Sequence, residues 1–215
     1  MKSYRIYSNM KEYIATGGVQ SSGKTTFIFD LARQMKVAGM STNVWTDIPR
    51  ECPLPINEDN SSLTQWWIAA AMMRRTIELG SIYDYVLSDR TALDCVMYEV
   101  ALRGWTPTAL ALMSATIEFL LTIPKTHILW VVKGWHTEGP KEETGRSGSI
   151  DFLRECEKAS AMVLYHIQQS RRIPVTIIDL TDPPTFDQII DPIDYSIDHL
   201  PDEPILKDPN ILDPL

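Results

Sequence analysis

The sequence of 215 residues is poor in cysteine, has no long apolar run and carries no excess of positive charge. Its cysteines, Cys52, Cys95 and Cys156, are widely spaced and odd in number, which indicates neither a disulfide framework nor a zinc site. Cys95 and Cys156 fall at apolar positions of helical patterns, so we expect both to be buried. No apolar run reaches the roughly 18 residues of a membrane-spanning helix, and the first residues lack the apolar core of a signal peptide. We therefore expect a cytoplasmic protein with no membrane contact.

The excess of acidic residues is concentrated near one end of the sequence. The net charge is −8, and residues 183–215 hold eight carboxylates against one lysine, which gives −7 for that segment. Residues 1–182 are therefore near −1, a balance that suits small anionic ligands better than a nucleic-acid groove. The acidic segment also holds seven of the 14 prolines. We expect one domain over residues 1–182 and a solvated, extended tail over 183–215, with docking of the tail's apolar residues on the body or on a neighbouring subunit left open.

Short apolar runs alternate with helical patterns over most of the chain. Strand-like runs occur at residues 13–16, 42–46, 83–88, 127–132 and 175–178. Apolar residues at helical spacing predict helices over about 24–39, 62–79, 91–103, 107–121 and 150–168. Parallel neighbours need crossovers of this length, and the helices would cover both faces of the sheet. The sequence therefore predicts an α/β, three-layer sandwich with a five-stranded parallel sheet and a ligand site at the carboxyl ends of its strands.

A phosphate-binding pattern stands between the first predicted strand and the first predicted helix. Gly18-Val-Gln-Ser-Ser-Gly23-Lys24-Thr25 has the spacing G-x-x-x-x-G-K-T. Glycines at these positions let backbone N–H groups surround a phosphate, while the helix directs its positive end toward it. Lys24 would bridge the β- and γ-phosphates, and the Thr25 hydroxyl would bind Mg²⁺. The expected ligands are ATP and Mg²⁺, held by Gly18, Gln20, Ser21, Ser22, Gly23, Lys24, Thr25 and Thr26.

Ser88-Asp89-Arg90-Thr91 directly follows the third predicted strand. Asp89 would thus lie at the carboxyl end of that strand, where an acid can hold magnesium or its water. Arg90 can bind a phosphate or balance the charge of a transferring group. The plainer alternatives are a solvent-facing helix cap for Asp89 and a surface ion pair for Arg90.

The residues that could bind the molecule that accepts a phosphoryl group, here called the acceptor, are more scattered along the sequence. Asp47, at the end of the second predicted strand, could orient a hydroxyl and take its proton, and Arg50 and Glu51 follow on the same loop. Trp66 lies on the helix predicted over about 62–79, which would flank an acceptor pocket where an aromatic ring could stack on a base. Arg146 lies in a glycine- and charge-rich segment that suits a lid over phosphates. The plainer alternatives are an ordinary loop acid for Asp47, a core aromatic residue for Trp66 and a solvated loop for the segment with Arg146.

Several segments together carry a family resemblance. They are Gly17–Thr26, Asp47–Glu51, Thr64–Ile68, and Ser88–Asp94 with Tyr98. In this order they resemble the nucleoside-kinase-like branch of P-loop kinases, which includes bacterial ribosylnicotinamide kinases and phage AAA-like NTPases, with thymidylate and deoxynucleoside kinases further off. The resemblance covers about residues 12–180 and implies the strand order 2-3-1-4-5, an Asp-Arg-Thr element at Asp89 and a lid containing Arg146. The family often has Glu where this chain has Asp47, and the acidic tail has no counterpart.

These observations lead to one functional expectation and two alternatives. We expect an ATP-dependent kinase that transfers a phosphoryl group to a hydroxyl or phosphate of a nucleoside-type acceptor, with a homodimer left open. The expected catalytic residues are Lys24, Asp47, Asp89, Arg90 and Arg146, Mg²⁺ would lie on Thr25 and Asp89, and the acceptor would contact Arg50, Glu51, Trp66 and Arg90. One alternative is a phage-type kinase acting on 5-hydroxymethyl pyrimidine in DNA, which needs a basic, aromatic-lined channel. The other is a nucleotide-binding ATPase without a small acceptor.

Overall fold

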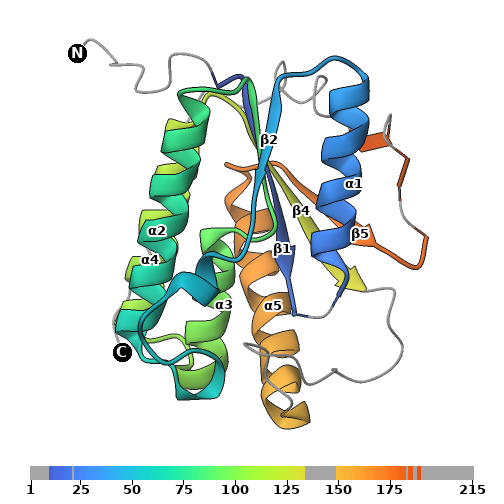
Figure 1. Cartoon of the computed structure of the whole chain (residues 1–215). Helices are drawn as coiled ribbons and strands as arrows, with labels where there is room; N and C mark the ends of the chain where they lie inside the picture. The colour runs from blue at the N-terminus through green and yellow to red at the C-terminus, as the bar shows by residue number, and fades with distance from the viewer. Residues whose placement is uncertain (1–9, 21, 134–148, 183, 186–187, 190–215) are drawn as a thin grey trace.

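The five strands form one sheet in the order β2-β3-β1-β4-β5, and each neighbouring pair is parallel. The computed structural model describes residues 10–20, 22–133, 149–182, 184–185 and 188–189. Helices lie on both faces of the sheet, which gives the three-layer α/β sandwich predicted from the sequence (Figure 1). The predicted strand order is therefore confirmed.

The helices and strands fall close to the predicted ranges. They are β1 (Glu12–Gly18), α1 (Lys24–Val37), β2 (Thr42–Trp45), the 3₁₀ helices η1 (Ile48–Glu51) and η2 (Asn57–Asp59), α2 (Ser62–Gly80), β3 (Tyr85–Ser88), α3 (Ala92–Arg103), α4 (Pro107–Thr122), β4 (Thr126–Lys133), α5 (Ile150–Ser170) and β5 (Val175–Asp179). β3 begins two residues later than predicted because the Tyr83 N–H bonds Leu79 O at the end of α2. β1 continues to Gly18 because Gly17 and Gly18 pair with β4.

The sheet separates two hydrophobic cores. The larger core packs α2, α3, α4 and α5 against one face and includes Trp130, which is fully buried. The smaller core packs α1 against the other face, around Ile14 and Ile28. Cys95 and Cys156 are buried in the larger core, as predicted. Among the described residues, no helix is both long and apolar enough to cross a membrane.

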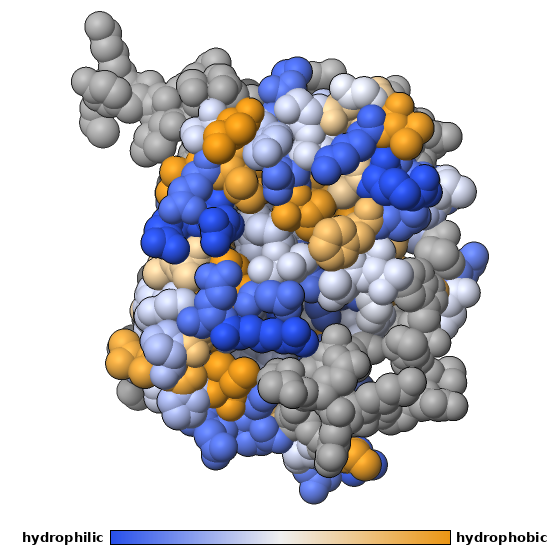
Figure 2. All heavy atoms as spheres, viewed as in Figure 1, coloured by the Kyte–Doolittle hydropathy of each residue, from blue (hydrophilic) through white to orange (hydrophobic). Residues whose placement is uncertain are grey.

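The surface outside these cores mixes apolar and polar residues (Figure 2). A shallow groove runs between α1 and the edge strand β2, where Phe29, Val37 and Val44 meet Arg33 and Lys36. Of the predicted site residues that the structure describes, none lines this groove. The groove is therefore separate from the residues considered next, which follow the carboxyl ends of β1, β2 and β3.

Candidate functional site

The turn from β1 into α1 requires glycine at both of its ends. Gly18 has φ +115°, and a Cβ atom there would lie 2.4 Å from the carbonyl oxygen of Val131. Gly23 caps α1 with φ +90°, a conformation that other residues rarely adopt. These glycines let the loop turn tightly against β4 and lead directly into the N-terminus of α1. Backbone N–H groups at such a helix start form a favourable site for an anion.

Lys24 lies across this loop. Its side chain is buried, and Nζ donates to the carbonyl oxygen of Val19 and to Oγ of Ser22, 3.2 Å away. The ammonium group is thus held by a backbone and a side-chain oxygen of the loop that the sequence predicts for phosphate binding. Gln20 is buried beside it, and Ser22 is half-buried. Ser21 lies outside the described residues.

Thr25 and Asp89 meet where the loop faces the end of β3. The Thr25 hydroxyl donates to Oδ2 of Asp89 across 2.6 Å. The other oxygen, Oδ1, is buried and has no hydrogen-bond partner among the described residues. Burial raises the pKa of Asp89, and the Thr25 hydrogen bond, Arg90 and Lys24 oppose that rise. Asp89 is therefore a buried carboxylate rather than a solvent-facing cap, and it keeps one oxygen available.

This pair fits a magnesium ion. A buried carboxylate oxygen without a donor beside a threonine hydroxyl offers hard oxygen ligands, which Mg²⁺ prefers. The described part of the chain contains no cluster of three His, Cys, Asp or Glu side chains that could enclose a metal. Thr25 and Asp89 would supply two oxygen ligands, and phosphates and water would complete the shell, as is usual for Mg²⁺.

Asp94 and Tyr98 of α3 contact the loop, and Arg90 lies just before α3. Asp94 accepts from Gly18 N at 3.0 Å and from Thr91 N at 2.8 Å. The Tyr98 hydroxyl donates to Oε1 of Gln20 at 3.4 Å, and the guanidinium of Arg90 lies 5.9 Å from the centre of the Tyr98 ring. Arg90, Asp94 and Tyr98 therefore stand in a row beside the loop. We call this row the α3 face.

Burial and charge act together on the α3 face. Burial raises the pKa of Asp94, while the positive charges of Arg90 and Lys24 and the two backbone donors oppose that rise. Burial also works against the Arg90 charge, but its neighbours Tyr98 and Asp94 raise the pKa of Arg90 overall. Arg90 is thus a permanently charged group held beside a carboxylate.

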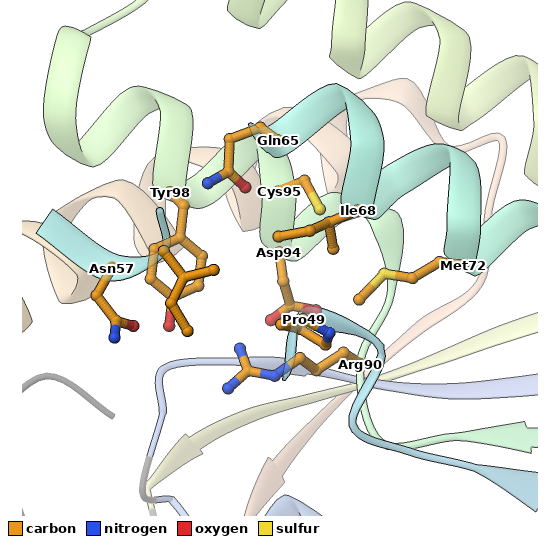
Figure 3. Close-up of a pocket in the computed structure, with 10 residues that line it drawn as sticks. Pro49, Asn57, Gln65, Ile68, Met72, Arg90, Asp94, Cys95 and Tyr98 are labelled. Carbon is orange, nitrogen blue, oxygen red and sulfur yellow. The ribbon is translucent and has the colours of Figure 1, made fainter. Parts of the chain in front are cut away.

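A pocket opens on the other side of the α3 face (Figure 3). Its cavity volume is about 40 Å³, and the space continues into open solvent. Side chains from α2, α3, the turn before α3 and the segment between β2 and α2 line it: Pro49, Ile56, Asn57, Gln65, Ile68, Met72, Arg90, Asp94, Cys95 and Tyr98. Its walls are mostly apolar with a few polar groups, the usual composition of a small-molecule site.

Gln65 is the most informative polar residue of this pocket. It is only 3% exposed, and its side-chain amide makes no hydrogen bond within the described part of the chain. Because Gln65 lines the pocket, its amide can pair with a polar group of a ligand there, and such hydrogen bonds would add to binding. The sequence hypothesis overlooked Gln65, although its spacing from Ile68 and Met72 puts a polar residue on the buried face of α2.

The residues predicted for the acceptor do not line the pocket, with the exception of Arg90. Trp66 packs against the larger core because it lies about 100° around α2 from Gln65. Arg50 pairs with Asp47 at 3.5 Å, and Arg75 lies 4.0 Å from Glu51, outside the pocket. Pro49 is the residue of η1 that lines it. Contacts of the acceptor with Arg50, Glu51 or Trp66 remain predictions.

Asp47 and Arg146 remain predictions for other reasons. Asp47 lies two residues beyond β2 and caps η1 at φ +63°. Its side chain is 61% exposed, and its charge contributes to raising the pKa of Asp89. It therefore stands at the edge of the site rather than inside the pocket. Arg146 lies outside the described residues, as does most of the predicted tail over 183–215. Thr26, at the exposed start of α1, follows the Lys24–Thr25 pair.

Comparison with known proteins adds no relative to this description. No protein-family model matches the chain, and no curated protein is significantly similar to it. The functional interpretation therefore rests on the residues of the loop, the α3 face and the pocket.

Proposed function

We propose that the protein is a Mg²⁺-dependent phosphotransferase that moves the γ-phosphoryl group of ATP to a hydroxyl group of a small, ring-bearing acceptor. The observation that supports this most is the α3 face. Asp94 and Tyr98 contact the phosphate-type loop, and the same two side chains line the pocket with Arg90. A donor loop and an acceptor pocket that share one wall bring a phosphoryl group and a hydroxyl together, which is the main requirement of phosphoryl transfer.

On the donor side, the chain supplies charge and orientation. Backbone N–H groups at the start of α1 would receive the phosphates, and Lys24 would exchange the Val19 carbonyl for phosphate oxygens. Thr25 and Asp89 would hold Mg²⁺, which supplies charge neutralisation to the phosphates when it is bound. Arg90, held between Asp94 and Tyr98, would balance the charge of the group in transfer.

On the acceptor side, the pocket favours a flat ring with polar groups on its edge. The Gln65 amide offers one donor group and one acceptor, which match the edge of a pyrimidine base or a carboxamide. Ile68 and Met72 give the ring an apolar surface, and Asn57 adds a second polar group. Asp47 is the proposed base for the hydroxyl proton and would have to approach it when the acceptor is bound.

The charges around the pocket support a small acceptor over DNA. Among the described residues that line the pocket, Arg90 is the single cation, and Asp94 balances it. The nearby cations Arg50, Arg75 and Arg103 all pair with carboxylates. A DNA substrate needs several cations available for phosphates, because counterion release supplies much of its affinity. In the described residues, this region does not offer them.

The test is an ATP-consumption screen of the purified full-length chain with Mg²⁺. The acceptors would be nucleosides, nucleoside monophosphates, nicotinamide riboside, and DNA with and without 5-hydroxymethyluracil. We expect ADP formation to depend on one small acceptor. Equal turnover with and without every acceptor would instead support an ATPase, and turnover on modified DNA alone would support the base kinase.

Two lysines of one helix provide the matched control. Lys24→Ala should abolish binding of Mg·ATP because it removes the cation of the loop, whereas Lys36→Ala, on the exposed surface of α1, should leave it unchanged. Isothermal titration calorimetry measures both. Wild-type affinity in the Lys24→Ala protein would refute the proposed donor site.

A further inference from the structure

Asp94 is a buried carboxylate with two separate hydrogen-bonding tasks. One oxygen accepts from Thr91 N, which completes the capping box at the start of α3. The other accepts from Gly18 N, 76 residues away in the sequence. A helix cap requires only the first of these contacts. The second contact therefore calls for its own explanation.

The Gly18 contact fixes the point where β1 passes into the phosphate-type loop. On one side, the backbone of Val131 approaches Gly18 so closely that no Cβ atom fits. On the other side, the Asp94 carboxylate holds the Gly18 N–H at 3.0 Å. The start of the loop is thus held from both sides. Tyr98, one turn further along α3, contacts the loop again at Gln20.

A carboxylate suits this position better than an amide does. Both oxygens of Asp94 accept from backbone N–H groups, and an asparagine has only one acceptor oxygen. The charge of Asp94 also faces Arg90 and Lys24, the cations that we assign to the phosphates. Removing the charge would therefore disturb both the backbone of the loop and the balance of its cations.

We propose that Asp94 is a positioning residue for nucleotide binding, which holds the start of the phosphate-binding loop in place through the Gly18 N–H. This inference rests on the proposed function, since it assumes that the loop binds a nucleotide. It also gives α3 a role beyond packing. The same residue lines the acceptor pocket, so the donor loop and the acceptor side are built on one carboxylate.

The test compares two substitutions in the same helix cap of the full-length chain. Thr91→Ala removes the hydroxyl that accepts from Leu93 N but leaves Gly18 untouched, and Asp94→Asn alters both the cap and the loop contact. We expect each to lower the melting temperature by about 2–4 °C, as loss of a helix cap does. Only Asp94→Asn should weaken Mg·ADP binding, by roughly tenfold or more, which calorimetry measures directly.

The amide proton of Gly18 gives an independent readout in the wild-type protein. We expect it to exchange slowly with solvent and its NMR shift to follow the titration of Asp94. Rapid exchange of this proton would overturn the proposal even if the Asp94→Asn protein did not fold. Equal Mg·ADP affinity in the Asp94→Asn and Thr91→Ala proteins would also overturn it. Failure of the wild type to bind Mg·ADP would instead refute the proposed function.

Discussion

The Thr25 hydroxyl donates to one oxygen of Asp89 at 2.6 Å and leaves the other oxygen buried without a partner. The residues come from the start of α1 and the end of β3, 64 positions apart. The carboxylate is thus desolvated on one side without full compensation. A buried, unpaired carboxylate oxygen lowers the stability of the folded protein but favours binding of a cation. Such a cost to stability is common at functional sites.

Replacement of Asp89 tests this balance. Burial raises the pKa of Asp89 in the folded state above its ordinary value of 3.8, so the unfolded chain loses this proton at a lower pH than the folded protein does. The folded protein therefore loses stability as the pH rises above 3.8. Asp89→Asn should therefore raise the melting temperature of the metal-free protein at pH 7, and this gain should shrink toward pH 4. Differential scanning calorimetry at the two pH values, without Mg²⁺, measures it.

The same substitution should remove the response to magnesium. Mg²⁺ with ADP should stabilise the wild type, since a ligand that binds the folded state raises the melting temperature, and should stabilise Asp89→Asn much less. Loss of a metal ligand should lower kcat/KM by about 100-fold or more. A variant that is less stable at pH 7 and retains its magnesium response would contradict the assignment of Asp89.

Gln65 and Trp66 are neighbours in sequence but have different surroundings in the fold. We expect Gln65→Leu to raise the acceptor KM by about 10- to 100-fold, because a polar acceptor edge would lose its hydrogen-bond partner. The KM for ATP should stay near its wild-type value. Steady-state kinetics with the acceptor found in the screen measure both constants.

Trp66→Phe is the matched control for Gln65. Since Trp66 packs against the larger core outside the pocket, its replacement should affect stability more than the acceptor KM. If Trp66→Phe raised the acceptor KM and Gln65→Leu did not, the original stacking hypothesis for Trp66 would be favoured. The pair therefore decides which face of α2 meets the acceptor.

The difference between Gln65 and Trp66 shows where sequence reasoning stops. The strands, the helices and the loop at Gly18 could be predicted because each depends on local spacing, and the sheet order followed from the family resemblance. The pocket face of α2 could not, since a shift of one residue turns a helix by about 100°. The role of Asp94 depends on its contact with Gly18, 76 residues away, and local patterns do not report such contacts.

Glu99 connects the ends of two helices from a fully buried position. It pairs with Arg103 at 2.8 Å and accepts from the Ser62 hydroxyl at 2.7 Å, at the start of α2. Glu99→Ala would leave the Arg103 charge without its carboxylate and should lower the free energy of unfolding by about 3 kcal/mol. Urea denaturation measures the loss. The matched control is Lys158→Ala, whose exposed pair with Glu155 should contribute almost nothing.

His127 should make the fold sensitive to acid. It is 4% exposed, Nε2 shares a hydrogen bond with Thr176 Oγ1 at 2.7 Å, and Nδ1 is buried without a partner among the described residues. Burial, with a smaller contribution from the Lys125 charge, lowers the pKa of His127 to about 4. The unfolded chain therefore binds the proton more readily than the folded protein does.

The stability that neutral His127 contributes is complete above its ordinary pKa of 6.5 and is lost as pH falls toward 4. The shift corresponds to at most about 3 kcal/mol. We expect His127→Gln to lower the free energy of unfolding at pH 7.5. Between pH 7.5 and 4.5, however, the free energy of unfolding of this variant should fall by less than that of the wild type. Urea unfolding at both pH values measures this difference. His166→Gln, which replaces an exposed ring beside Trp105, should keep the wild-type dependence of the free energy of unfolding on pH. If His127→Gln kept that same dependence, the acid sensitivity would belong to other groups.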